Sequence, residues 1–162
     1  MPIKRRISPC LGFDGEAEEA ANFYVSIFKN SRITAVSRYG DAGPGPKGSV
    51  MVIGFELDGQ AFTGLNGGPM FKFTEAISMI VHCETQAEVD FYWEKLSTGG
   101  LPGRCAWLKD KFGVSWQIVP TALIELMQDK DAAKSARVMQ AMLQMTKIDI
   151  AGLQRAYDGK VE

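Results

Sequence analysis

Residues 105–120 of the chain read CAWLKDKFGVSWQIVP, and this stretch carries most of the information about the fold. Two short apolar segments joined by a tight turn predict a β-hairpin, and Pro120 brings its second strand to an end. Alternation along that strand places Trp116 and Ile118 on one face and Gln117 on the other. An uncharged amide is therefore expected on the inner face of an apolar strand.

The order strand, helix and β-hairpin occurs twice along the chain, which predicts two similar modules. In the first half we expect four strands and a helix: strands at 7–13, 31–39, 50–57 and 60–65, and a helix over 16–30. In the second half we expect three strands and a helix: strands at 76–83, 105–110 and 113–119, and a helix over 86–100. The segment around LPGR (101–104) is too short and glycine-rich to predict the remaining strand.

Turn and capping residues support these assignments. Asp58-Gly59, between two strands, is typical of a two-residue hairpin turn. Thr85, followed three residues later by Glu88, matches a capping box at the start of the second helix. Asp110 is expected to cap the turn of the second hairpin.

The two halves also align with each other. Aligning their helices places Ser8 opposite Ser78, and aligning their hairpin turns places Thr63 opposite Gln117. An internal repeat of this kind predicts that each pair occupies equivalent positions in the two modules.

A helical segment is expected after Pro120, with helices at 122–128, 132–145 and 148–157. Met139, Met142 and Met145 recur at three-residue intervals and form one apolar face of this segment. That face packs either on its own domain or on a second subunit, and the sequence leaves both arrangements open.

The charge balance argues against some partners. The 18 basic and 19 acidic residues are interspersed and give a formal net charge of -1, without the basic stripe that nucleic-acid binding requires. We find no export signal and no run of about 18 apolar residues, so we expect neither secretion nor a membrane span. The 3 cysteines, an odd number without CxxC spacing, indicate reduced thiols in a cytoplasmic protein.

Four stretches resemble one known family: ISPCLGFDGEAEEAANFY (7–24), LNGGP (65–69), CETQAEVDFYWEKL (83–96) and CAWLKDKFGVSWQIVP (105–120). They are similar to the 3-demethylubiquinone 3-methyltransferase-like, or PhnB-like, family of the vicinal oxygen chelate superfamily, which also contains glyoxalase and bleomycin-resistance proteins. The resemblance covers about residues 5–158 and includes VMQAMLQMTKIDIAGLQRAY at 138–157.

This resemblance implies an α+β fold of paired βαβββ modules, the glyoxalase-like fold, whose eight strands form a partly open sheet around a cavity. The modules would span about 5–69 and 75–120 within a single domain over 1–120. Residues 121–162 would form a helical extension packed on that domain or on the partner subunit of a homodimer.

The resemblance also raises the question of a metal, because superfamily enzymes generally hold one divalent ion with His, Glu or Gln ligands. The matching positions in this sequence are Ser8, Thr63, Ser78 and Gln117. Hydroxyls and a neutral amide supply no charge to offset a dication, so we expect neither a metal nor a cofactor. A site built from Cys10, His82 and Gln117 is the off-pattern alternative.

Several of these residues are candidates for a ligand site. Six are expected to contact a ligand: Ser8, Cys10, Thr63, Asn66, Ser78 and Gln117. Gln117 either orients a ligand or forms hydrogen bonds only with its polar neighbours. Asn66 either offers amides to an anion at the cavity rim or belongs to an ordinary turn.

The loop at 40–49 is either a lid or a surface loop. As catalytic candidates, His82 would act as a general base with Gln117 as an orienting donor; the alternative for His82 is a structural role.

The residues favour a protein that binds a small, partly apolar molecule in a cavity without a metal. Three enzymatic alternatives stay open. The family name implies methyl transfer to a quinol, although the glycine-rich strand-to-helix turn that normally holds a sulfonium cofactor is absent. A glyoxalase- or dioxygenase-type reaction would require a divalent metal. Metal-free acid–base catalysis would depend on His82.

Overall fold

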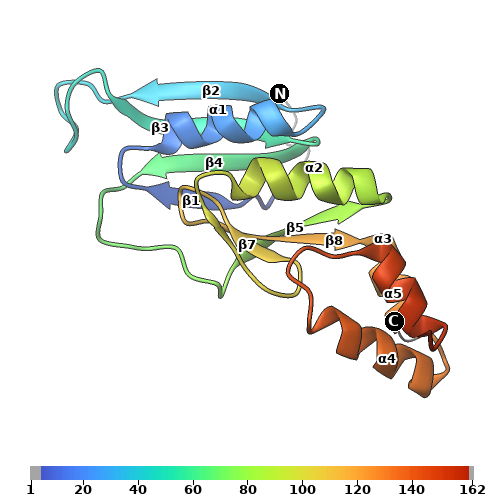
Figure 1. Ribbon diagram of the computed structural model, residues 1–162. Helices are drawn as coiled ribbons and strands as arrows, with labels where there is room; N and C mark the ends of the chain where they lie inside the picture. The colour runs from blue at the N-terminus through green and yellow to red at the C-terminus, as the bar shows by residue number, and fades with distance from the viewer. Residues whose placement is uncertain (1–4, 161–162) are drawn as a thin grey trace. The chain divides into compact units, whose positions relative to one another are not determined.

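The computed structural model describes residues 5–160, and Figure 1 shows its helices and strands. The chain divides into two compact units, Met1–Lys72 and Phe73–Glu162. Each unit contains a four-stranded sheet with a helix on one face. The α+β architecture with two βαβββ modules is therefore confirmed, with β6 as the short strand that the sequence did not predict.

The first unit is built from five elements: β1 (Cys10–Phe13), α1 (Ala17–Ile27), β2 (Arg32–Arg38), β3 (Val50–Leu57) and β4 (Gln60–Asn66). The strand order is β1-β4-β3-β2, with β1 parallel to β4 and the other pairs antiparallel. α1 buries a stripe of small and apolar side chains at helical spacing, among them Ala17, Ala20 and Tyr24. Gly64 faces this helix, and a Cβ there would lie 3.3 Å from the Cβ of Ala17.

The second unit repeats this pattern and adds three helices. Its elements are β5 (Ser78–Cys83), α2 (Gln86–Ser97), β6 (Leu101–Pro102), β7 (Trp107–Lys109), β8 (Ser115–Pro120), α3 (Thr121–Met127), α4 (Ala132–Met142) and α5 (Ile150–Tyr157). The strand order β5-β8-β7-β6 matches that of the first unit, and β5 is parallel to β8. β6 has only two residues, in keeping with the weak sequence signal at that point.

The register of the two sheets confirms the internal alignment. Cys10 is paired with Thr63 in the first sheet, and Ile80 is paired with Gln117 in the second. Cys10 and Ile80 each lie two residues after the aligned serines. Thr63 and Gln117 therefore occupy equivalent positions, as the repeat predicted.

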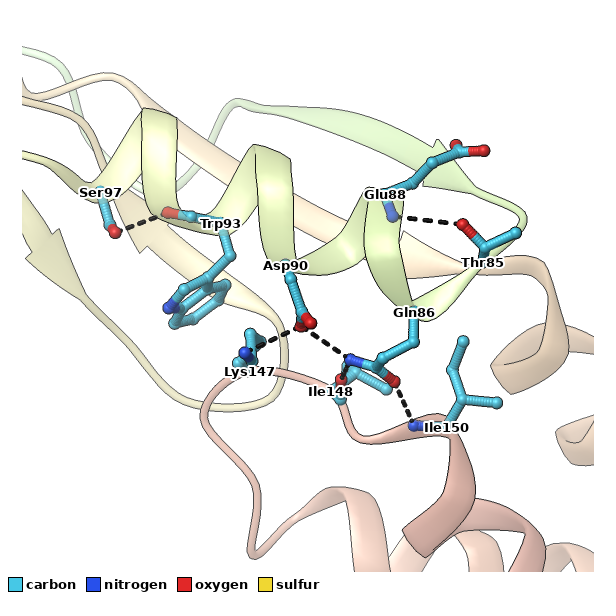
Figure 2. Close-up of polar contacts among 9 residues, drawn as sticks. All are labelled: Thr85, Gln86, Glu88, Asp90, Trp93, Ser97, Lys147, Ile148 and Ile150. Atoms are coloured by element: carbon cyan, nitrogen blue, oxygen red, sulfur yellow. Dashed lines mark hydrogen bonds and ion pairs between the residues drawn. The ribbon is translucent and has the colours of Figure 1, made fainter.

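The predicted turn and cap are also present. Asp58 and Gly59 have φ angles of 48° and 76°, the left-handed conformation that a tight hairpin turn requires. At the start of α2 the Thr85 hydroxyl accepts a hydrogen bond from the Glu88 amide at 3.2 Å (Figure 2). The Glu88 carboxylate accepts the amide of Glu84, one residue before the cap, at 3.4 Å, rather than the Thr85 amide of a full capping box.

Helices α3–α5 pack within the second unit. Their core consists of five buried residues: Ala106, Leu123, Val138, Ile148 and Leu153. Met142 and Met145 pack against this core, whereas Met139 is 38% exposed, so the predicted methionine face is divided between interior and surface. Contact of this extension with a second subunit stays a prediction.

A polar clamp joins α2 to residues 147–150, where α5 begins (Figure 2). The Gln86 amide donates to the Ile148 carbonyl at 3.0 Å and accepts from the Ile150 amide at 2.8 Å. Beside it, Lys147 forms an ion pair with Asp90 at 2.8 Å. One glutamine side chain thereby satisfies a donor and an acceptor of the extension's main chain.

Candidate ligand-binding site

The second sheet carries three of the seven predicted site residues: Ser78, His82 and Gln117. α2 packs on one face of this sheet, where Trp116, Ile118 and Val81 are buried. Strand alternation therefore directs the side chains of Gln117 and Ile80 to the other, open face. The structure thus places Gln117 on the face of the sheet opposite Trp116 and Ile118, as the sequence predicted.

Gln117 lies at the centre of a row that crosses three strands. Its register partners are Ile80 on β5 and Trp107 on β7. Ile80 is 50% exposed, and the other two side chains are half-buried. The row therefore presents an aliphatic group, an amide and an indole side by side on neighbouring strands, which are about 4.8 Å apart.

The Gln117 amide is held at one end only. Its Nε2 donates to the Ser78 hydroxyl at 2.9 Å, so these two predicted residues are in direct contact. Among residues 5–160 no donor reaches its Oε1. A pure polar plug would satisfy both ends of the amide, whereas this arrangement leaves a carbonyl acceptor on the open face.

A buried carboxylate fixes the hairpin that carries Gln117. Asp110, only 3% exposed, accepts hydrogen bonds from the Phe112 amide at 2.8 Å and from the Val114 amide at 3.1 Å. Its other oxygen accepts the Trp116 indole N–H at 2.8 Å. The predicted capping role of Asp110 is confirmed, and the bond to Trp116 orients the strand on which Gln117 lies.

His82 lies on the same face of β5 as Ile80 but is paired in register with Val119 rather than with Gln117. Its imidazole is exposed, and no hydrogen bond to another described residue orients it. A general base normally has such an orienting partner. The catalytic role of His82 stays a prediction.

The first sheet carries the other predicted residues on its own open face. Cys10 and Thr63 are register partners, and the Thr63 amide donates to the Pro9 carbonyl at 3.0 Å. Leu11 and Phe13 point to the helix side, which leaves Cys10 exposed on the opposite side. Ser8 precedes the strand and is exposed.

Asn66 has a structural role at the end of β4. Its side-chain oxygen accepts the Ala17 amide at 2.9 Å and its nitrogen donates to the Val50 carbonyl at 3.0 Å. Its main-chain carbonyl accepts the Tyr39 hydroxyl at 3.1 Å. Both ends of this amide are therefore used within the fold, one of them to satisfy the first amide of α1.

The loop at 40–49 is packed around the Tyr39 ring. A Cβ at Gly43 or Gly45 would lie 2.5 Å or 2.4 Å from ring carbons, so only glycine allows this approach. Beneath part of the loop lies a cavity of about 750 Å³, bounded by the loop and the ends of β3 and β4.

The donor set does not fit a divalent metal. The four positions matched to the superfamily ligands carry three hydroxyls and one amide, and none of these groups is anionic. Within residues 5–160 no three His, Cys, Asp or Glu side chains converge in a way that could hold an ion. Burial raises the pKa of the Cys83 thiol to about 11, so this thiol is protonated at neutral pH in the metal-free protein.

The residues do not fit a sulfonium cofactor either. Gly67-Gly68 follows β4, but the next element is β5 rather than a helix. The helix amino terminus that would complete such a nucleotide-binding turn is missing at this point.

Comparisons with known proteins place these features in a family. The family model described as 3-demethylubiquinone-9 3-methyltransferase matches residues 5–119. The PhnB protein of Bacillus cereus is 41% identical over 72% of this chain and 99% of its own, with a TM-score of 0.65. The family match ends before α3, so the resemblance of 138–157 to this family stays a prediction.

More distant structures share the fold. Protein PA1353 from Pseudomonas aeruginosa is 21% identical over 72% of this chain and 98% of its own, with a TM-score of 0.60. The fosfomycin resistance protein FosX from Listeria monocytogenes is 17% identical over 79% of this chain and 100% of its own, with a TM-score of 0.56. No curated protein matches the chain. The chain belongs to the PhnB-like 3-demethylubiquinone-9 3-methyltransferase family and has the fold of the vicinal oxygen chelate superfamily.

Proposed function

We propose that this protein binds a small, partly apolar organic molecule on the open face of its second sheet and that binding requires no metal. The observation that carries this proposal is the row Ile80–Gln117–Trp107, in which a half-satisfied amide lies between two apolar groups. Ligand sites typically combine apolar walls with a few oriented polar groups. Ile80 and Trp107 supply the first, and the Gln117 carbonyl supplies the second.

The unpaired groups favour this face over the cavity beneath the 40–49 loop. In that cavity Asn66 and Tyr39 are bonded to the fold. Arg38 donates to the Gly48 carbonyl at 3.0 Å and lies 3.6 Å from the Glu18 carboxylate. Polar groups that already have partners contribute little to ligand affinity, because binding would have to break those bonds.

The absence of anionic donors supports the metal-free part of the proposal. Binding through neutral donors and acceptors needs no deprotonated ligand set and therefore no particular metal.

No described helix is long and apolar enough to cross a membrane. A homodimer and a cytoplasmic location stay predictions.

The test is an affinity measurement with 2-naphthamide, a neutral amide with an apolar ring system. Isothermal titration of the chelator-treated protein should give saturable binding. Gln117→Leu should weaken it about five- to tenfold, the loss of roughly one hydrogen bond. Thr63→Val changes the equivalent position of the first sheet and serves as the matched control, with unchanged affinity expected.

Two results would overturn the proposal. One is binding that appears only after a divalent metal is added back. The other is an equal loss of affinity in the Gln117 and Thr63 variants, which would show that the second sheet has no special role.

A further inference from the structure

A second row of side chains crosses the same open face, next to the one that contains Gln117. Ser115 on β8 is paired in register with Ser78 on β5 and with Lys109 on β7. Ser115 and Gln117 are two residues apart on one strand, so their side chains point to the same face. The two rows are therefore about 6.6 Å apart along the strands.

The second feature of this row is a buried hydroxyl, that of Ser115. Ser115 is 1% exposed, and its Oγ is the buried side-chain oxygen for which residues 5–160 provide no hydrogen-bond partner. Buried hydroxyls are normally bonded to protein, water or ligand, and an unpaired one calls for an explanation.

Its neighbour Ser78 is also poised as a donor. The Ser78 oxygen accepts the Gln117 amide at 2.9 Å, and its own proton is not donated to any described residue. A hydroxyl with one acceptor position filled can still donate outward. Two hydroxyl donors therefore lie on adjacent strands.

Lys109 adds a positive charge to the row and is already paired with a carboxylate of the protein. Its ammonium forms an ion pair with Glu75, whose side chain is 59% exposed. The hydrogen bond from Lys109 is the main cause that lowers the pKa of Glu75. Exposed ion pairs are weak, and an ammonium has three donors, so a second carboxylate can displace Glu75 or bind beside it.

We infer that the row Ser78–Ser115–Lys109 binds the carboxylate of an organic anion whose apolar body lies over Ile80 and Trp107. The inference rests on the proposed function and adds the chemical class of the ligand. Two hydroxyls and an ammonium match the acceptor oxygens of a carboxylate, and the apolar row lies where the rest of the molecule would extend. Glu75 then competes with the ligand for Lys109.

The experiment compares 2-naphthoate with 2-naphthamide, which has nearly the same shape but no charge. The wild-type protein should bind the naphthoate at least about threefold more tightly. Lys109→Met should weaken naphthoate binding about fivefold or more and change naphthamide binding less than about twofold. Lys111→Met, which removes the same charge from the same hairpin, should leave both affinities unchanged.

Two further variants test the roles of the neighbouring groups. Glu75→Gln removes the competing carboxylate and should tighten naphthoate binding by about threefold. Ser115→Ala should weaken naphthoate binding while leaving naphthamide binding unchanged. If Ser115 only holds a buried water, naphthoate affinity will not change in this variant, and the assignment of Ser115 to the anion row is wrong.

The outcomes distinguish a failure of the anion row from a failure of the proposed function. Equal affinity of the wild-type protein for both probes would overturn the anion row and leave the proposed function intact. Binding of neither probe would overturn the proposed function itself. Equal effects of Lys109→Met and Lys111→Met would show that net charge, rather than this row, attracts the anion.

Discussion

Replacing Asp110 with alanine should destabilise the second unit severely. The carboxylate accepts three hydrogen bonds, from the amides of Phe112 and Val114 and from the indole of Trp116. Val114 and Trp116 are each 3% exposed, so water cannot easily replace the lost acceptor. Phe112 is only half-buried, and its amide can be hydrated.

The magnitude follows from the two buried donors. Each buried donor left without a partner costs about 1–3 kcal/mol, which gives a loss of about 2–6 kcal/mol for Asp110→Ala. Domains are stable by only about 5–15 kcal/mol, so this is a large share of the total. With an m-value of about 2 kcal/mol/M, the urea midpoint should fall by about 1–3 M.

The assay is urea unfolding of both proteins, followed by tryptophan fluorescence and far-UV circular dichroism. Asp58→Asn is the matched control, because Asp58 is an exposed residue in the hairpin turn of the first unit and asparagine tolerates its positive φ. That variant should change stability by less than about 0.5 kcal/mol. A loss below about 1 kcal/mol for Asp110→Ala would refute the reasoning that these bonds hold the hairpin.

Three further predictions concern other parts of the chain. At about pH 8, Ellman's reagent should modify exposed Cys10 rapidly and leave Cys83 unmodified until the protein unfolds. The reason is that burial raises the pKa of the Cys83 thiol to about 11. Modification of Cys83 in the folded protein would contradict this prediction. Gly45→Ala should lower the free energy of unfolding by about 1–3 kcal/mol, because the added Cβ would overlap the Tyr39 ring. Gly40→Ala is the control, since a Cβ there meets open space. Equal melting temperatures of the two variants would refute the overlap. Gln86→Ala should speed amide exchange in residues 147–150, and unchanged exchange rates would show that the clamp is dispensable.

The local elements of the fold were predictable because their signals are local. Asp58-Gly59 requires a positive-φ turn wherever it lies between two strands, and the Thr85 cap depends on residues within one helical turn. The internal repeat added long-range information, since it aligned Thr63 with Gln117 before any register was known. Element ends were less accurate: α4 ends at Met142, although its apolar pattern continues to residue 145.

The side-chain clamp on α2 could not be predicted from the sequence. Gln86 bonds to main-chain atoms 62 and 64 residues later in the chain, and every residue type has those atoms. The left-handed conformation of Cys105 and Ala106, with φ of 55° and 76°, was equally hidden, because neither residue type favours it. Their amides donate to the carbonyls of residues 145 and 146, so tertiary contacts maintain the conformation.

The candidate site was predicted in part. Alternation along β8 identified Gln117 as the inner amide, and the repeat identified Ser78, with which it bonds. The same alternation directs Ser115 to that face, but only the three-dimensional structure shows that its hydroxyl is buried without a partner. Trp107 was missed because its role depends on the pairing of β7 with β8, which places it beside Gln117.

The most direct test of the central claim is a two-dimensional ¹⁵N–¹H spectrum of the chelator-treated protein, recorded during titration with 2-naphthamide. If the probe binds on this face, the side-chain amide signals of Gln117 and the indole signal of Trp107 will shift together and saturate. The signals of the buried Trp116 indole and of the first-unit residue Thr63 will stay in place. Shifts confined to the first unit, or shifts that require added metal, would contradict a metal-free site on the open face of the second sheet.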